Sequence, residues 1–229
     1  NTVGGTASGA GNVISGNNAP GVYIVRAGAT GNTVAGNLIG TDISGLLALG
    51  NAFSGVVLFG GAQSNRIGTN GDGVSDAEER NLISGNGHSG ITILTPATDR
   101  NVVAGNFIGT EATGTAALSN GIDGVLIFAG ASNNLVGGAS AAARNIISGN
   151  QNGVRISGTD ANGNMVQGNF IGTDVTGSVK IGNSIAGVGI DNIVTGNVVG
   201  GSVAGAGNVI SGNAGGVRIV AQGANANLV

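Results

Sequence analysis

The chain has 229 residues, of which 48 are glycine and 8% are charged, and it contains no cysteine. Two prolines exclude a collagen helix, a hydrophobic fraction of 41% excludes a disordered chain, and the lack of cysteine excludes disulfides and thiolate metal sites. The net charge of −3 with scattered basic residues predicts no nucleic-acid partner, and polar residues interrupt the uncharged stretch 43–65, so no membrane insertion is expected.

A five-residue phrase, Asn-x-apolar-x-Gly, recurs along the whole chain. It begins at residues 12, 32, 51, 81, 101, 120, 145, 164, 183 and 208. Three unit types alternate, and the set of three returns every 63 to 69 residues. Units of this size are too small to bury a core alone, so strict repetition indicates a solenoid in which neighbouring units stack.

Within each unit, apolar residues alternate with small or polar ones, which is the period of a half-buried strand. The clearest pairs in chain order are Val22 and Ile24, Val56 and Leu58, Val125 and Ile127, Val154 and Ile156, and Val217 and Ile219. Helices are disfavoured because each interior glycine costs a helix about 1 kcal/mol. The chain is therefore predicted to be all-β: one domain, 1–229, forming a single-stranded right-handed parallel β-helix of about ten coils.

Each predicted coil has 19–30 residues, and three coils form a super-repeat. The apolar third residue of the phrase should point inward, so Ile14, Val34, Phe53 and Ile83 are expected in one column. Glycine permits the sharp turn at a positive φ. Asparagine repeated in register should form a ladder of side-chain amides, which would satisfy polar groups that are otherwise costly to bury.

The segments GNFIGTDVTG, NNLVGGASAAARNIISGN and GVRISG resemble the parallel β-helix repeats of bacterial secreted and cell-surface proteins. These proteins share the right-handed pectate-lyase-like superfold, and the resemblance covers nearly the entire chain. It is specific for architecture and poorly specific for activity, since the superfold serves lyases, hydrolases, epimerases, tailspikes and passive stalks. The resemblance implies export and, for enzymatic members, acidic or neutral polysaccharide substrates.

The strongest deviation from the repeat is an acidic insert, IGTNGDGVSDAEERN, at 67–81. Aligned with a twelve-residue calcium loop, its oxygen ligands would be Asn70, Asp72, Asp76 and Glu79. The first position of that loop is Gly68, which supplies no carboxylate. The sequence thus predicts a Ca²⁺ site that lacks one ligand, and the alternative is a solvated turn, because NGDG is also strong turn chemistry.

Acidic residues also follow a Gly-Thr pair at Asp42, Glu111 and Asp174, at the same place in every middle unit. The expected separation of about 14 Å follows from three strand spacings. Paired carboxylates of glycosidases lie about 5–9.5 Å apart, so this row does not predict one. We expect these acids to cap turns, and a row of weak cation or glycan contacts is the alternative.

The few aromatic residues predict more core than surface. Phe107 and Phe170 share one position with Leu38 and are expected to form an internal stack, and Phe59 and Phe128 are also expected in the core. Tyr23 is expected outside because it alternates with Val22 and Ile24. Later units place Thr92, Arg155 and Arg218 at the position of Tyr23.

No catalytic residues are predicted. The only histidine, His88, is expected to be exposed, and alignment of the units pairs Asp160 with Lys180 as a surface ion pair. Irregular outward positions disfavour the threonine rows of ice-binding solenoids.

Asn1 begins within the pattern and 227–229 begin another unit, so we expect a fragment of a longer solenoid without end caps. The predicted function is a structural or adhesive segment of an exported bacterial surface protein. Its expected partners are neighbouring domains or copies of itself at the solenoid ends, with polysaccharide as a further candidate. The alternative function is a carbohydrate-active enzyme or glycan-binding module of the same superfold.

Overall fold

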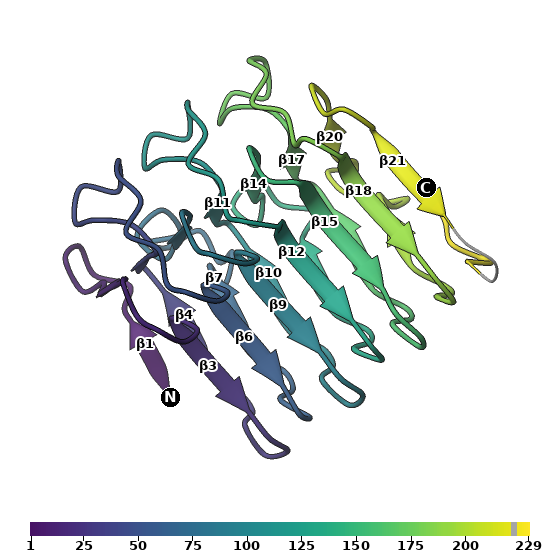
Figure 1. The fold of residues 1–229 in the computed structure, drawn as a ribbon, viewed down its shortest axis with the longest axis horizontal. Helices are drawn as coiled ribbons and strands as arrows, with labels where there is room; N and C mark the ends of the chain where they lie inside the picture. The colour runs from purple at the N-terminus through teal and green to yellow at the C-terminus, as the bar shows by residue number, and fades with distance from the viewer. Residues whose placement is uncertain (221–223) are drawn as a thin grey trace.

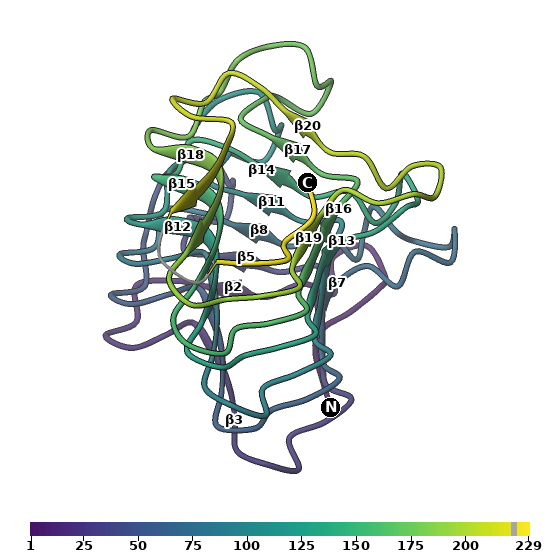
Figure 2. The same cartoon turned by 90° about the vertical axis from the view of Figure 1, so that its right-hand side faces the viewer.

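The computed structural model describes residues 1–220 and 224–229, and every regular element in it is a β-strand. The strands form three seven-stranded parallel sheets, each built from strands three apart in the chain (Figure 1). Figure 2 shows the three sheets surrounding a common interior. The predicted right-handed parallel β-solenoid is confirmed.

The three sheets are named A, B and C in the order in which the chain enters them. Sheet A contains β1 (Thr2–Gly4), β4 (Thr33–Ala35), β7 (Arg66–Gly68), β10 (Val102–Ala104), β13 (Leu135–Gly137), β16 (Met165–Gln167) and β19 (Val198–Val199). Sheet B contains β2 (Val13–Ile14), β5 (Leu38–Ile39), β8 (Leu82–Ile83), β11 (Phe107–Ile108), β14 (Ile146–Ile147), β17 (Phe170–Ile171) and β20 (Val209–Ile210). Sheet C contains β3 (Val22–Val25), β6 (Val56–Phe59), β9 (Ile91–Leu94), β12 (Asp123–Phe128), β15 (Asn152–Ser157), β18 (Ala186–Asp191) and β21 (Val217–Val220).

The described chain makes seven coils, so the prediction of ten coils of 19–30 residues is wrong. One coil contributes a strand to each sheet, and the register of sheet A places Thr2 beside Thr33 and Thr33 beside Arg66. A coil is therefore longer than a sequence unit, and three units span two coils. The predicted number of coils is wrong because the five-residue phrase occurs at only some of the corners between sheets. Other corners carry an asparagine without the rest of the phrase, such as Asn37 after Gly36.

The expected single inward column is also wrong. Val34 lies in sheet A, whereas Ile14 and Ile83 lie in sheet B, and Phe53 is 49% exposed at a corner. The phrase opens sheet A in one unit type and sheet B in another. In the third type it turns the corner before sheet C, and its closing glycine there is dictated by space: a Cβ on Gly55 would lie 2.7 Å from Ile83 Cγ2.

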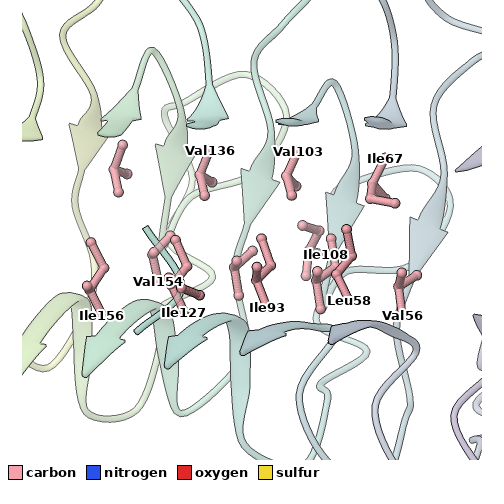
Figure 3. Packing of buried hydrophobic residues seen from close by; sticks show 14 of the residues in the cluster. Val56, Leu58, Ile67, Ile93, Val103, Ile108, Ile127, Val136, Val154 and Ile156 are labelled. Atoms are coloured by element: carbon pink, nitrogen blue, oxygen red, sulfur yellow. The ribbon is translucent and has the colours of Figure 1, made fainter. Parts of the chain in front are cut away.

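The interior is a continuous stack of aliphatic side chains from all three sheets (Figure 3). Val56 and Leu58 of sheet C, Ile67 of sheet A and Ile108 of sheet B are fully buried in it. Each such side chain contributes about 1.5–3 kcal/mol through removal from water. Because every strand is short, this burial is available only when coils stack, as the repeat predicted.

The predicted asparagine ladder exists at all three corners of the coil. The corner before sheet A carries Asn1, Asn32, Asn65, Asn101, Asn134, Asn164, Asn197 and Asn227. The corner before sheet B carries Asn12, Asn37, Asn81, Asn106, Asn145, Asn169 and Asn208. The corner before sheet C carries Asn17, Asn51, Asn86, Asn120, Asn150, Asn183 and Asn213.

One ladder residue shows why these amides can be buried. The Nδ2 of Asn51 donates to the carbonyl of Ile14 at 2.9 Å and to Oδ1 of Asn86 at 2.9 Å. Its Oδ1 accepts from Nδ2 of Asn17 at 2.7 Å. With both donors and the acceptor satisfied, Asn51 is fully buried without an unpaired polar group.

Connections between sheets alternate in length from coil to coil. Odd-numbered coils have long connections from sheet A to sheet B. Even-numbered coils have long connections from sheet B to sheet C, which we call the arches, at 40–50, 109–119 and 172–182. The arches stack on one another, since the Ala112 amide donates to the Gly45 carbonyl and the Val175 amide to the Gly114 carbonyl, both at 3.0 Å.

The arches cover a second apolar cluster on the outer face of sheet B. Phe107 and Phe170 belong to it, so their predicted internal stack is wrong: they pair beside Ile146 and point away from the interior. The guanidinium carbons of Arg80 and Arg144 lie 4.3 and 4.1 Å from the centroids of the Phe107 and Phe170 rings. Cation–π contacts therefore close this layer.

Candidate functional site

The acidic insert forms a self-bonded turn in the connection from β7 to β8. Oδ1 of Asp72 accepts the Val74 amide at 2.8 Å, and its Oδ2 accepts from Nδ2 of Asn70 at 2.8 Å. Oδ1 of Asn70 accepts the Asp72 amide at 2.9 Å. These bonds are the side-chain-to-backbone pattern by which Asn and Asp stabilise turns.

The other two predicted calcium ligands are held in the same way. Glu79 is 2% exposed, and its Oε2 accepts the Asn70 amide at 2.8 Å. Asp76 accepts the Gly73 amide at 3.0 Å and the hydroxyl of Thr69. All four side chains therefore have donors from the insert itself, and an ion would have to displace those donors.

The structure shows no group of three or more His, Asp or Glu side chains suited to a metal among residues 1–220 and 224–229. Calcium binding by Asn70, Asp72, Asp76 and Glu79 stays a prediction. The donors inside the insert are an independent reason for its shape.

The acids of the Gly-Thr-Asp/Glu motifs organise the three arches. Oδ1 of Asp42 accepts the amides of Leu46 at 3.2 Å and Leu47 at 3.1 Å, and both oxygens accept the Ser44 hydroxyl. Asp174 and Glu111 make the equivalent bonds in their own arches. This is the turn-capping role that the sequence predicts.

Hydrogen bonding lowers the pKa of these carboxyl groups. The Ser44 hydroxyl and the Leu47 amide lower the pKa of Asp42, and the Val179 amide does so for Asp174. Burial raises the pKa of Glu111, but the bonds donated by residues of its arch outweigh it and bring the pKa to about 2. All three acids are thus held as carboxylates in the folded chain.

The outer face of sheet C carries two columns of outward side chains and differs from the other faces. The first column is Tyr23, Val57, Thr92, Leu126, Arg155, Gly189 and Arg218, and the second is Val25, Phe59, Leu94, Phe128, Ser157, Asp191 and Val220. In Figure 1 the strands of sheet C lie at the front, and the arches project beyond their upper ends. Apart from Thr92, the columns are aromatic and aliphatic over the first four coils, and they are polar or charged over much of the rest.

The aromatic residues of this face test three predictions. Tyr23 is 54% exposed, as expected, and its ring stacks with Phe59 at a centroid distance of 6.5 Å. Phe59 and Phe128 are not in the core, because they alternate with the buried Leu58 and Ile127 and therefore point outward. Phe128 is 40% exposed.

A charged cluster lies on the same face across the fourth, fifth and sixth coils. Nε of Arg155 lies 2.9 Å from Oδ2 of Asp191, and Nδ2 of Asn152 donates to Oδ1 of Asp123 at 2.8 Å. Asp123 is fully buried and its Oδ2 has no partner in the described residues. Burial raises the pKa of Asp123, and the attraction of Arg155 and the bond from Asn152 oppose that rise.

The ion pair expected between Asp160 and Lys180 does not form. Lys180 belongs to the third arch, whereas Asp160 follows β15 at the opposite end of sheet C. The error follows from the coil length, because positions counted from the repeated phrase do not correspond across corners. Aligning DGVLIF, NGVRIS, AGVGID and GGVRIV on their shared Gly-Val pair would have found the Arg155 and Asp191 neighbours.

A hollow of about 600 Å³ lies at the end of sheet C where the chain leaves it for sheet A. Its lining crosses four coils and consists of Pro96, Phe128, Ala129, Gly158, Thr159, Asp160, Asn192 and Ile193. Sequence reasoning missed it because these residues come from four separate turns. His88 lies elsewhere, exposed at a corner with its ring 5.3 Å from that of Phe53.

Comparison with models of known protein families gives no match, and neither curated proteins nor solved structures give a significant one. Across the part of the chain that the structure describes, no helix has the length and apolar character needed to cross a membrane.

Proposed function

We propose that the chain is a structural and adhesive segment of a longer exported bacterial surface protein of the pectate-lyase-like type, without catalytic activity. The observation that supports this proposal most directly is the outer face of sheet C. It presents exposed aromatic and charged side chains on the longest strands of the molecule, Asp123–Phe128 among them. Sheets A and B have strands of two or three residues, and the arches cover much of sheet B.

Rigidity suits such a role. Three asparagine ladders bond each coil to the next, and the arches add bonds between coils that are two apart. A surface held by this framework loses little conformational entropy when it binds, because its side chains are already positioned. The same framework transmits load along the stack without a flexible linker.

We further propose that the outermost coils bind another coil, from neighbouring domains or a second copy. In inner coils, Oδ1 of each ladder asparagine accepts a hydrogen bond from the preceding coil. In the first coil, Asn12 and Asn17 hold this position, and their Oδ1 atoms can accept from an added coil. At the other end, Nδ2 of Asn208 donates to the Val166 carbonyl at 2.8 Å, and its second hydrogen is the one that Asn169, an inner residue of the same ladder, gives to the next coil. These are complementary head-to-tail contacts, and exposed strand edges favour such pairing.

The function is tested by immobilising the purified chain and measuring retention of polysaccharides alongside their cleavage. We expect retention of at least one polysaccharide, with no unsaturated products or new reducing ends from uronate or neutral substrates, with or without calcium. Release of such products would overturn the non-catalytic proposal, and failure to retain any polysaccharide would overturn the adhesive one.

A carbohydrate-active enzyme is the second candidate, and the cluster of Asp123, Arg155 and Asp191 favours it. A carboxyl group with a raised pKa beside an arginine is a combination found in acid–base catalysis. Asp123 is fully buried, so substrate would reach it only after the surface rearranged. If any cleavage is measured, its loss in Asp123→Asn would assign it to this cluster.

A further inference from the structure

The hollow at the end of sheet C combines an apolar wall with polar groups on one rim. Phe128 is 40% exposed and Ile193 is 57% exposed, and they come from the fourth and sixth coils. Gly158 lies beneath the Phe128 ring, since a Cβ added there would lie 3.0 Å from Phe128 Cε2. The ring therefore rests with part of its surface against backbone and part open to the hollow.

The polar groups in the lining are mainly acceptors. Asp160 and Thr159 are exposed. Nδ2 of Asn192 donates to the Ser157 hydroxyl at 2.9 Å, and no described residue donates to its Oδ1, which can therefore accept. An apolar wall with a few polar groups and a volume within the usual range of about 300–1,000 Å³ is typical of small-molecule sites.

The charge of the lining selects among ligands. Among the described residues that line the hollow, Asp160 is the only ionisable one. The nearby Arg155 is already paired with Asp191 at 2.9 Å. A carboxylate or sulfate group on a ligand would therefore meet a like charge without a free cation, whereas hydroxyl groups would find acceptors.

Three residues other than glycine that line the hollow have a positive φ, a conformation that glycine adopts without strain. Ala129, Asp160 and Asn192 line it with φ values of 51°, 65° and 68°. The residue that follows a strand of sheet C also has a positive φ in the first and third coils, at Arg26 and Thr95, so this conformation belongs to the corner and positions Ala129 and Asn192. Two further hollows lack these features, because they are lined by core side chains of the first and last coils, such as Val34 and Val199.

We propose that this hollow binds a neutral pyranose unit of a glycan. One face of the sugar ring packs on Phe128 and Ile193, and its hydroxyl groups donate to Asp160 and to Oδ1 of Asn192. The inference rests on the proposed adhesive function and names its ligand class and contact site. It also assigns the discrimination against uronate to the single charge of Asp160.

The test is titration of the whole chain with cellotetraose, mannotetraose and tetragalacturonate, followed by ligand-observed NMR and calorimetry. We expect binding of a neutral tetrasaccharide and none of tetragalacturonate. Phe128→Ala should weaken neutral binding about tenfold, because the largest apolar contact is lost. Phe53→Ala is the matched control, because Phe53 is 49% exposed at the corner before sheet C, away from the hollow, and the change should leave binding unchanged.

Asp160→Asn tests the charge without disturbing the backbone, since asparagine also tolerates a positive φ. Neutral binding should fall about threefold through the weaker acceptor, and tetragalacturonate should begin to bind. Ile193→Ala provides a second apolar variant if Phe128→Ala does not fold.

The outcomes separate this site from the proposed function. Polysaccharide retention that Phe128→Ala, Ile193→Ala and Asp160→Asn leave intact would overturn the site and keep the adhesive function. Tight binding of tetragalacturonate by the parent chain would overturn the neutral ligand class. Retention of no glycan at all would overturn both.

Discussion

The outer faces of sheets B and C both carry phenylalanine side chains, but the environments of these side chains differ. Phe107 on sheet B is 5% exposed under an arch and beside Arg80, whereas Phe128 on sheet C is 40% exposed beside a hollow. Both rings point away from the interior from strands of the same coil. The difference teaches that the length of the connection beside a strand, and not the strand, decides whether an outward aromatic is structural or available to a ligand.

The largest effect on stability is expected at the outer face of sheet B, which the arches cover. Phe107→Ala removes a buried ring from the layer beneath the arches and leaves a cavity, so we expect a loss of about 3–5 kcal/mol in the free energy of unfolding. Phe128→Ala should cost about 1 kcal/mol or less, because the ring is already partly in water. Urea denaturation of both variants measures the difference, and equal losses would contradict the comparison.

The arch that covers Phe107 should depend on the ionisation of Glu111. Its pKa is lowered to about 2 from 4.5, so its contribution is fully present above about pH 4.5 and is lost as the pH falls through about 2. Glu111→Gln should cost about 1–3 kcal/mol at pH 7 and less at pH 2. Denaturation at several pH values measures this, and a cost that does not change with pH would exclude the carboxylate as the cause.

On the open face, the pH dependence should have the opposite sign. Burial raises the pKa of Asp123 above 3.8, so the folded chain favours the protonated carboxyl group. The stability that this group contributes is fully present below pH 3.8 and is lost as the pH rises through the folded-state pKa. Asp123→Asn should stabilise the chain by about 1 kcal/mol at pH 7, because a neutral amide is less costly to bury than an unpaired carboxylate. Denaturation at pH 7 and at pH 3 measures this effect. A variant that is no more stable than the parent chain at pH 7 would contradict the prediction.

The smallest expected effect concerns calcium at the insert beside sheet A. Because Asp72 and Glu79 are already bonded to donors in the insert, we propose at most a weak site. At a calcium concentration equal to its dissociation constant, binding would add about 0.4 kcal/mol of stability. Melting in chelator and in millimolar calcium, with Asp72→Asn as the control, measures it. Identical melting curves would remove the calcium proposal.

The exact placement of the functional surfaces could not be predicted from the sequence. The hollow joins Pro96, Phe128, Asp160 and Asn192, which come from four coils and become neighbours only when the true coil length is known. The predicted ten coils separated them. Asp123 and Arg155 were missed for the same reason, although their segments share a Gly-Val pair that marks the entry to sheet C.

The sequence by itself determined the strands, the sharp glycine turns and the asparagine ladders, because alternation, positive φ and amide pairing depend on a few adjacent residues and on their repetition. Only the tertiary structure decided that each coil has three sides and that the phrase serves different corners. The physical reason is that an apolar residue after asparagine packs equally well into sheet A or sheet B. Closure of the coil around a shared core, and the alternating connections outside it, then determined which side chains are buried and which are exposed.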